Sequence, residues 1–135
     1  MTVVVGYVPG PSGEAALGAA LGEADRRREA LLVVNVGRSD AAGDPRFLDE
    51  GERNRLADRL LFAGAAFEIE QLVRGREAAD ELVEAAARVR ASLLVIGMRR
   101  RSPTGKLLFG SQAQRILLDA DCPVLAVKAP RSHGG

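Results

Sequence analysis

The chain is poor in the side chains that most often carry catalysis or covalent cross-links. It has one cysteine, one histidine and no tryptophan in 135 residues. A single cysteine excludes an intrachain disulfide, and the sequence shows neither the Cys/His spacing of a metal site nor paired carboxylates near a candidate site. Acid–base and nucleophilic chemistry therefore lack their usual reactants, and we expect a protein that is not an enzyme.

Long apolar runs and an excess of one charge are also absent. No apolar stretch of about 18 residues and no cleavable leader is visible, so we expect a soluble, cytoplasmic protein without a membrane span. Nineteen basic and 18 acidic side chains leave a formal charge of +1, which is too small to attract nucleic acid or an anionic membrane. The length predicts one domain over residues 1–129, followed by a disordered tail at 130–135.

Short apolar, β-branched runs alternate along the chain with segments of helical periodicity. Four runs are almost continuously apolar, as expected for strands buried on both faces, whereas the run at 66–73 alternates with polar residues and predicts an edge strand. The predicted strands are 3–8, 31–36, 66–73, 93–96 and 124–127, and the predicted helices are about 13–29, 44–64, 76–90 and from 111 onward. This alternation predicts an α/β fold, a five-stranded parallel sheet with helices on both faces.

Three polar residues are predicted to cap the first turns of helices. Asp44 precedes Pro45, which is tolerated at the first helical position. Ser111 is followed three residues later by Gln114, a capping-box pattern. Ser12 is expected to cap the first helix.

The segment from Gly97 to Ser111 is the strongest functional signal. It combines a strand that ends in glycine, a basic loop, and a Gly-Ser pair at the start of a helix. This combination brings backbone N–H groups, positive charge and a helix N-terminus to one place. Ligands of parallel α/β sheets bind at the carboxyl ends of the strands, where the winding direction reverses. The loops after Val8, Val36 and Gly97 therefore predict a phosphate-binding site.

The same segment, with the Cys122-Pro123-Val124 entry to the last strand, resembles the signature of the universal stress protein family. Nucleotide-binding members carry a glycine, two residues, a second glycine, nine residues, and a glycine followed by Ser or Thr. Gly97, Gly110 and Ser111 match at that spacing. The resemblance implies a Rossmann-like (adenine nucleotide alpha hydrolase-like) sheet with strand order 3-2-1-4-5, and a stress-response protein that binds ATP, ADP or AMP in a regulatory, non-catalytic role.

Two positions depart from that signature. Arg100 stands where the second glycine is expected, and Val8 stands where the family has the Asp that contacts adenine, while Val36 matches the family's valine on the adenine side. A lost hydrogen bond to the base would weaken binding by about 1 to 3 kcal/mol. The Arg100 guanidinium either pairs with a phosphate or occupies the pocket. The alternative to a nucleotide-binding regulator is a dimeric interaction module whose pocket is closed by Arg100 and Val8.

We expect six residues around this segment and on the second strand to bind the ligand. They are Val36, Gly97, Arg100, Gly110, Ser111 and Gln112. Mg²⁺ is expected only together with a bound nucleotide, with Asp40 and Asp44 as candidate contacts. No base is placed to activate Ser12 or Ser111 as a nucleophile, so at most a very slow ATPase activity is expected.

The last strand, Val124 to Val127, predicts how the chain associates with itself. It ends the strand order as an exposed apolar edge, which invites pairing with a second chain. Family members pair there, so we expect a homodimer, in addition to an unknown protein partner. Leu125→Pro is expected to produce monomers by removing a backbone donor from this edge.

Overall fold

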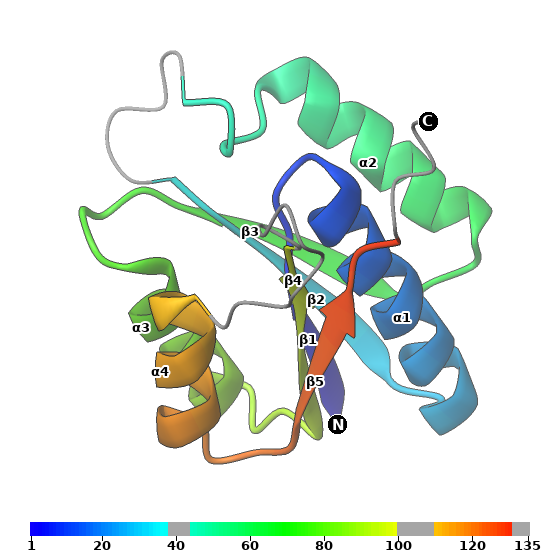
Figure 1. Cartoon of the computed structure of the whole chain (residues 1–135). Coiled ribbons are helices and arrows are strands. Elements are labelled where there is room, and N and C mark those ends of the chain that lie inside the picture. The colour runs from blue at the N-terminus through cyan, green and yellow to red at the C-terminus, as the bar shows by residue number, and fades with distance from the viewer. Residues whose placement is uncertain (38–43, 100–109, 131–135) are drawn as a thin grey trace.

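The computed structural model describes residues 1–37, 44–99 and 110–130. They form one parallel sheet of five strands in the order β3-β2-β1-β4-β5, which confirms the predicted fold and strand order (Figure 1). The strands are β1 (Thr2–Gly6), β2 (Ala30–Val36), β3 (Phe67–Leu72), β4 (Leu93–Met98) and β5 (Val124–Lys128). The helices are α1 (Pro11–Arg27), α2 (Glu50–Phe62), α3 (Ala78–Arg88) and α4 (Ser111–Asp119).

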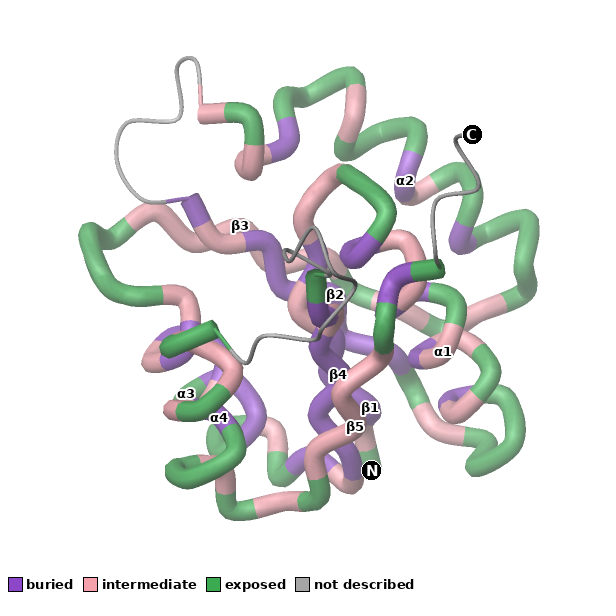
Figure 2. Tube along the Cα trace, viewed as in Figure 1, coloured by how far each residue is buried: buried purple, intermediate pink, exposed green. Residues whose placement is uncertain are grey.

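The helices cover the two faces of the sheet in pairs, α1 and α2 on one face and α3 and α4 on the other (Figure 1). Successive residues of a strand point to opposite faces. In β1, Val3 and Val5 therefore pack in the α1/α2 core, and Val4 packs in the α3/α4 core. The three central strands are buried on both sides (Figure 2), which explains their continuous apolar sequences. No helix in the described ranges is long and apolar enough to cross a bilayer.

Helix α2 begins later than the sequence predicts. Asp49, not Asp44, is its N-cap: the Asp49 carboxylate accepts from the Glu52 backbone N–H at 2.7 Å, and the Glu52 carboxylate accepts from the Asp49 N–H at 3.0 Å. This reciprocal capping box satisfies two donors. Asp44 instead accepts from the Arg46 N–H at 2.9 Å, so the Asp44–Pro45 start was wrong because Asp44 forms a turn of its own.

Two other predicted caps are also wrong. Helix α4 does open at Ser111, but its N-cap is Gly110, and no side chain caps it. Ser12 lies inside the first turn of α1, whose N-cap is Gly10. In the described part of the chain, helices α1 and α4 thus begin without a side-chain acceptor for their first N–H groups.

The first turn of α1 packs directly on backbone. A Cβ atom on Gly13 would lie 1.7 Å from the Val8 carbonyl oxygen, and one on Gly97 would lie 2.2 Å from the Ser12 carbonyl oxygen. Neither distance leaves room for a side chain. These two glycines therefore let α1 start close to the ends of β1 and β4.

Asn35 joins four segments at the carboxyl edge of the sheet. It is fully buried, and its Nδ2 donates to the carbonyl oxygens of Tyr7 at 2.9 Å and Arg46 at 2.8 Å. Its Oδ1 accepts from the Leu48 N–H at 2.9 Å and from Gln71 Nε2 at 3.1 Å. Every hydrogen-bonding position of the amide is used, so one side chain links the end of β1, the segment before α2, and β3.

We predict that Asn35→Leu destabilises the fold by about 3 kcal/mol or more, because buried backbone groups lose their only side-chain partner at about 1–3 kcal/mol each. Urea unfolding measures the loss. Asn54→Leu makes the same chemical change on the exposed surface of α2 and should shift stability by less than about 0.5 kcal/mol. Equal effects of the two variants would contradict the role given to Asn35.

Candidate functional site

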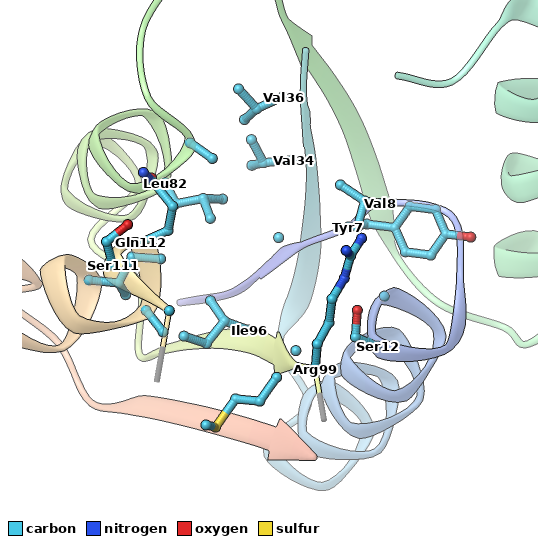
Figure 3. A pocket seen from close by; sticks show the side chains of 18 residues that line it. Tyr7, Val8, Ser12, Val34, Val36, Leu82, Ile96, Arg99, Ser111 and Gln112 are labelled. Carbon is cyan, nitrogen blue, oxygen red and sulfur yellow. The ribbon is translucent and has the colours of Figure 1, made fainter. Parts of the chain in front are cut away.

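A cavity of about 650 Å³ opens at the carboxyl ends of β1, β2 and β4 (Figure 3). Its walls are the first turns of α1, α3 and α4. Its volume lies within the roughly 300–1,000 Å³ range of small-molecule sites. It occupies the edge where ligands bind in open α/β sheets.

The floor and one side of the cavity are apolar. Val34 and Val36 come from β2, Ile96 comes from β4, and Leu82 comes from α3 (Figure 3). These side chains offer a surface for a flat apolar group such as a nucleobase. Val8 also lines the cavity and offers no hydrogen-bonding side chain there.

Three helix N-termini point at this space, since Ser12, Ala78 and Ser111 all line it. A helix N-terminus carries unsatisfied N–H groups and a partial positive charge. Because no described side chain caps α1 or α4, those groups are available to an anionic ligand.

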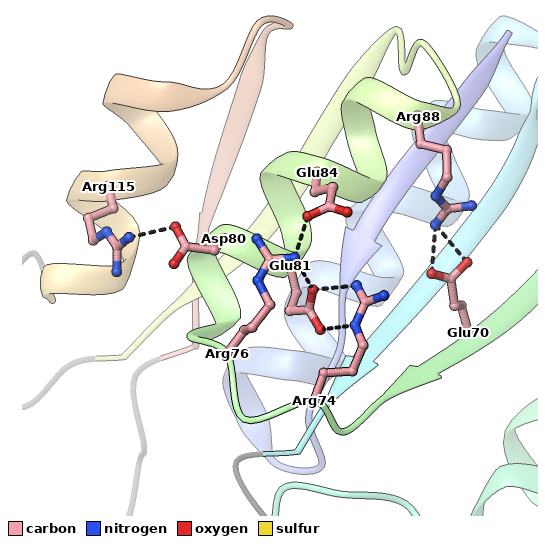
Figure 4. A network of polar contacts seen from close by, with 8 residues as sticks. All are labelled: Glu70, Arg74, Arg76, Asp80, Glu81, Glu84, Arg88 and Arg115. Atoms are coloured by element: carbon pink, nitrogen blue, oxygen red, sulfur yellow. Dashed lines mark hydrogen bonds and ion pairs between the residues drawn. The ribbon is translucent and has the colours of Figure 1, made fainter.

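Arg99 is the one charged side chain among the described residues that line the cavity. The acidic residues of the first turn of α3 are paired elsewhere (Figure 4). The fully buried Glu81 carboxylate forms ion pairs with Arg74 at 2.5 Å and with Arg76 at 3.0 Å. The Asp80 carboxylate forms an ion pair with Arg115 of α4 at 2.5 Å. The charge presented to a ligand by the described lining is therefore positive.

Five of the six predicted ligand-binding residues line this one cavity: Val36, Gly97, Gly110, Ser111 and Gln112. The sixth, Arg100, lies outside the described residues. Gly97 has a structural reason to be glycine, because its missing side chain would collide with α1. Gly110 has no such reason: the space around its Cβ position is open, and its backbone is extended.

The Gln112 side chain is already engaged. Its Oε1 accepts from the Ala79 N–H at 2.8 Å, and its Nε2 donates to Glu77 at 2.7 Å. Gln112 thus satisfies a first-turn donor of α3 and fixes the start of α4 beside the start of α3. Its amide shapes the cavity wall through these contacts.

The candidate metal contacts do not gather at the cavity. Asp44 is not among its lining residues and pairs with Arg46, and Asp40 lies outside the described residues. Within the described ranges, no group of three or more His, Cys, Asp or Glu side chains is placed to hold a metal ion.

Comparison with known proteins identifies the family. The model of the Universal stress protein family matches residues 1–128. The universal stress protein of Mycolicibacterium smegmatis is 48% identical over 126 residues, which cover 93% of this chain and 96% of that protein. The chain belongs to the universal stress protein family, as the Gly97–Ser111 signature indicates.

Two solved structures of the family carry nucleotides. The universal stress protein from Archaeoglobus fulgidus in complex with dAMP is 29% identical, with a TM-score of 0.65 and coverage of 95% of this chain and 98% of that one. A universal stress protein in complex with cAMP is 26% identical, with a TM-score of 0.72 and coverage of 96% and 98%.

A polar contact that the sequence does not predict fixes the turn before α1. The Tyr7 hydroxyl donates to the Glu14 carboxylate at 2.5 Å, and Arg59 of α2 pairs with the same carboxylate at 2.6 Å. The Tyr7 side chain points away from the cavity (Figure 3), while its backbone lines it. Burial, and then the hydrogen bond to Glu14, raise the pKa of Tyr7 to about 12.

Because Tyr7 is the only tyrosine, its absorbance titration reports this contact directly. We predict a midpoint near pH 12 in the folded protein and near about 10 in urea. The raised pKa means that the neutral phenol stabilises the fold below about pH 10, and that this contribution is lost as the pH rises toward 12.

Glu14→Gln should lower the folded midpoint, while Glu23→Gln on the same helix, whose carboxylate pairs with Arg26 and Arg27, should leave it unchanged. The same midpoint in the folded and the urea-unfolded protein would contradict the assignment.

Proposed function

We propose that this chain binds an adenine nucleotide, ATP, ADP or AMP, in the cavity at the carboxyl edge of the sheet. The observation that carries the proposal is an apolar cavity of about 650 Å³ walled by three helix N-termini, of which those of α1 and α4 have no side-chain cap among the described residues. The apolar floor suits a base, and the helix N-termini suit phosphates. The dAMP and cAMP complexes of related proteins support this choice of ligand.

Different residues would contact the base and the phosphates of the ligand. Val34, Val36 and Leu82 would pack against the base, and the open backbone at Gly110 and Ser111 would receive phosphate oxygens. With Val8 beside the cavity, no side-chain carboxylate contacts the base. We therefore expect weaker discrimination among bases than a carboxylate would give.

We infer a regulatory rather than a catalytic role. The described lining residues include no His, Cys, Asp or Glu, so neither Ser12 nor Ser111 has a neighbouring base to activate it. Mg²⁺ would enter with the phosphates of the ligand, because the described lining offers no carboxylate of its own. Ligand occupancy would then act by changing the surface that the chain presents to a partner in a stress response.

The competing hypothesis, a module with a closed pocket, requires Val8 and Arg100 to fill this space. Val8 lines the cavity and still leaves about 650 Å³, which favours the nucleotide-binding hypothesis. The contribution of Arg100 stays a prediction.

Gly110→Val tests the proposal because nothing described lies within 4 Å of its Cβ position, so the fold should tolerate the change. We predict at least a tenfold loss of ATP affinity by calorimetry, about 1.4 kcal/mol, with a smaller loss for Gly110→Ala. Gly18→Val, at an equally open position on the outer surface of α1, is the matched control. If the wild type binds ATP and Gly110→Val binds it with the same affinity, the nucleotide lies elsewhere.

We further propose that two chains pair through β5, which forms one edge of the sheet. The structure shows that Leu125→Pro is not a suitable variant to test this pairing. Pro123 O and Ala129 N both bond to β4, and successive residues of a strand point their backbone groups to opposite sides. Leu125 therefore faces β4, and Ala126 faces outward, so Leu125→Pro would damage the sheet itself.

Ala126→Pro removes an outward N–H and leaves the ladder to β4 intact. We predict a dimeric mass for the wild type and for Ala126→Ser, and a monomeric mass for Ala126→Pro, by light scattering at micromolar protein. A wild-type chain that is monomeric under these conditions would contradict the proposal.

A further inference from the structure

The wall of the cavity that α1 forms carries a hydroxyl without a partner among the described residues. Ser12 is 9% exposed as a residue, and its side chain has no hydrogen-bond partner among the described residues. Because no buried side-chain oxygen in the described ranges lacks a partner, the Ser12 hydroxyl is accessible from the cavity. Figure 3 shows the hydroxyl directed toward the cavity. A serine hydroxyl can both donate and accept a hydrogen bond, so this accessible hydroxyl is suited to a ligand.

Arg99 adds a positive charge on the same wall. Its side chain extends from the end of β4 past Ser12 toward Val8 (Figure 3). In the described part of the chain its guanidinium forms no ion pair or hydrogen bond. A guanidinium fork matches the geometry of phosphate oxygens.

Helix α1 contributes its own N-terminus here. It is 17 residues long, begins at Pro11 after a glycine N-cap, and has no side-chain cap. Ser12 lies in its first turn, so the hydroxyl and the N-terminal partial positive charge act at the same place. The described residues that line this wall include no acid to oppose that charge.

We propose that Ser12, Arg99 and the N-terminus of α1 form a second anion subsite, which takes a phosphoryl group of the bound nucleotide. Ser111 of α4 lies on the opposite side of the cavity (Figure 3), so the two subsites face each other. The assignment to a nucleotide rests on the proposed function. The anion subsite itself rests on the three groups of this wall.

The first experiment measures ATP and adenosine affinity by calorimetry. In the wild type we expect ATP to bind more tightly than adenosine. Arg99→Gln and Ser12→Ala should each reduce that preference and leave adenosine affinity unchanged. For Arg99→Gln we expect a reduction of about tenfold or more, the size of one charge-assisted hydrogen bond. Arg53→Gln makes the same charge change on the exposed surface of α2 and should change neither ligand.

The second experiment uses inorganic phosphate, monitored by the amide resonances of the first turn of α1. Saturable shifts of Ser12 and Gly13 that disappear in Arg99→Gln support the subsite even where adenosine does not bind, in which case only the proposed function fails. Three results would overturn the subsite: shifts that do not saturate, shifts confined to Ser111 and Gln112, or an ATP preference that survives Arg99→Gln. None of them would contradict binding of the base on the apolar floor of the cavity.

Discussion

The four hydrogen bonds of Asn35 are the constraint on which the ligand-binding edge depends. One buried amide holds the chain after β1, the approach to α2 and the end of β3 in fixed positions. Its partner Tyr7 carries the turn into α1, and Tyr7 is held in turn through Glu14 and Arg59. The loop that carries Val8 and Ser12 is therefore fixed from the sheet side and from the helix side.

The cavity follows from how these helices start rather than from any single binding residue. Parallel strands deliver each following helix with its N-terminus at the same edge. Gly13 and Gly97 then let α1 approach the backbone closely, and Gln112 fixes α4 to the start of α3. The result is an apolar floor below positive helix ends, while the acids of α3 are neutralised by arginines outside the cavity.

The periodicity of the chain was enough to predict the parallel sheet and the four helices, because buried parallel strands and amphipathic helices leave different apolar spacings. The strand order came from the resemblance to the family. Local capping was harder to predict. Helix α2 is capped by Asp49 and Glu52 rather than by Asp44 before Pro45, and neither Ser12 nor Ser111 acts as a cap. Asn35 was visible as the one polar residue in an apolar strand, but its partners come from distant segments. The engagement of Gln112 and the packing role of Gly97 likewise depend on tertiary contacts.

Amide hydrogen exchange with and without ATP locates the nucleotide on the fold, because it reports where a ligand slows backbone opening. We predict ATP-dependent protection in the first turn of α4 and at the carboxyl ends of β1, β2 and β4, with no change in α2. Saturating ATP that leaves this edge unprotected, or that protects α2 instead, would contradict it.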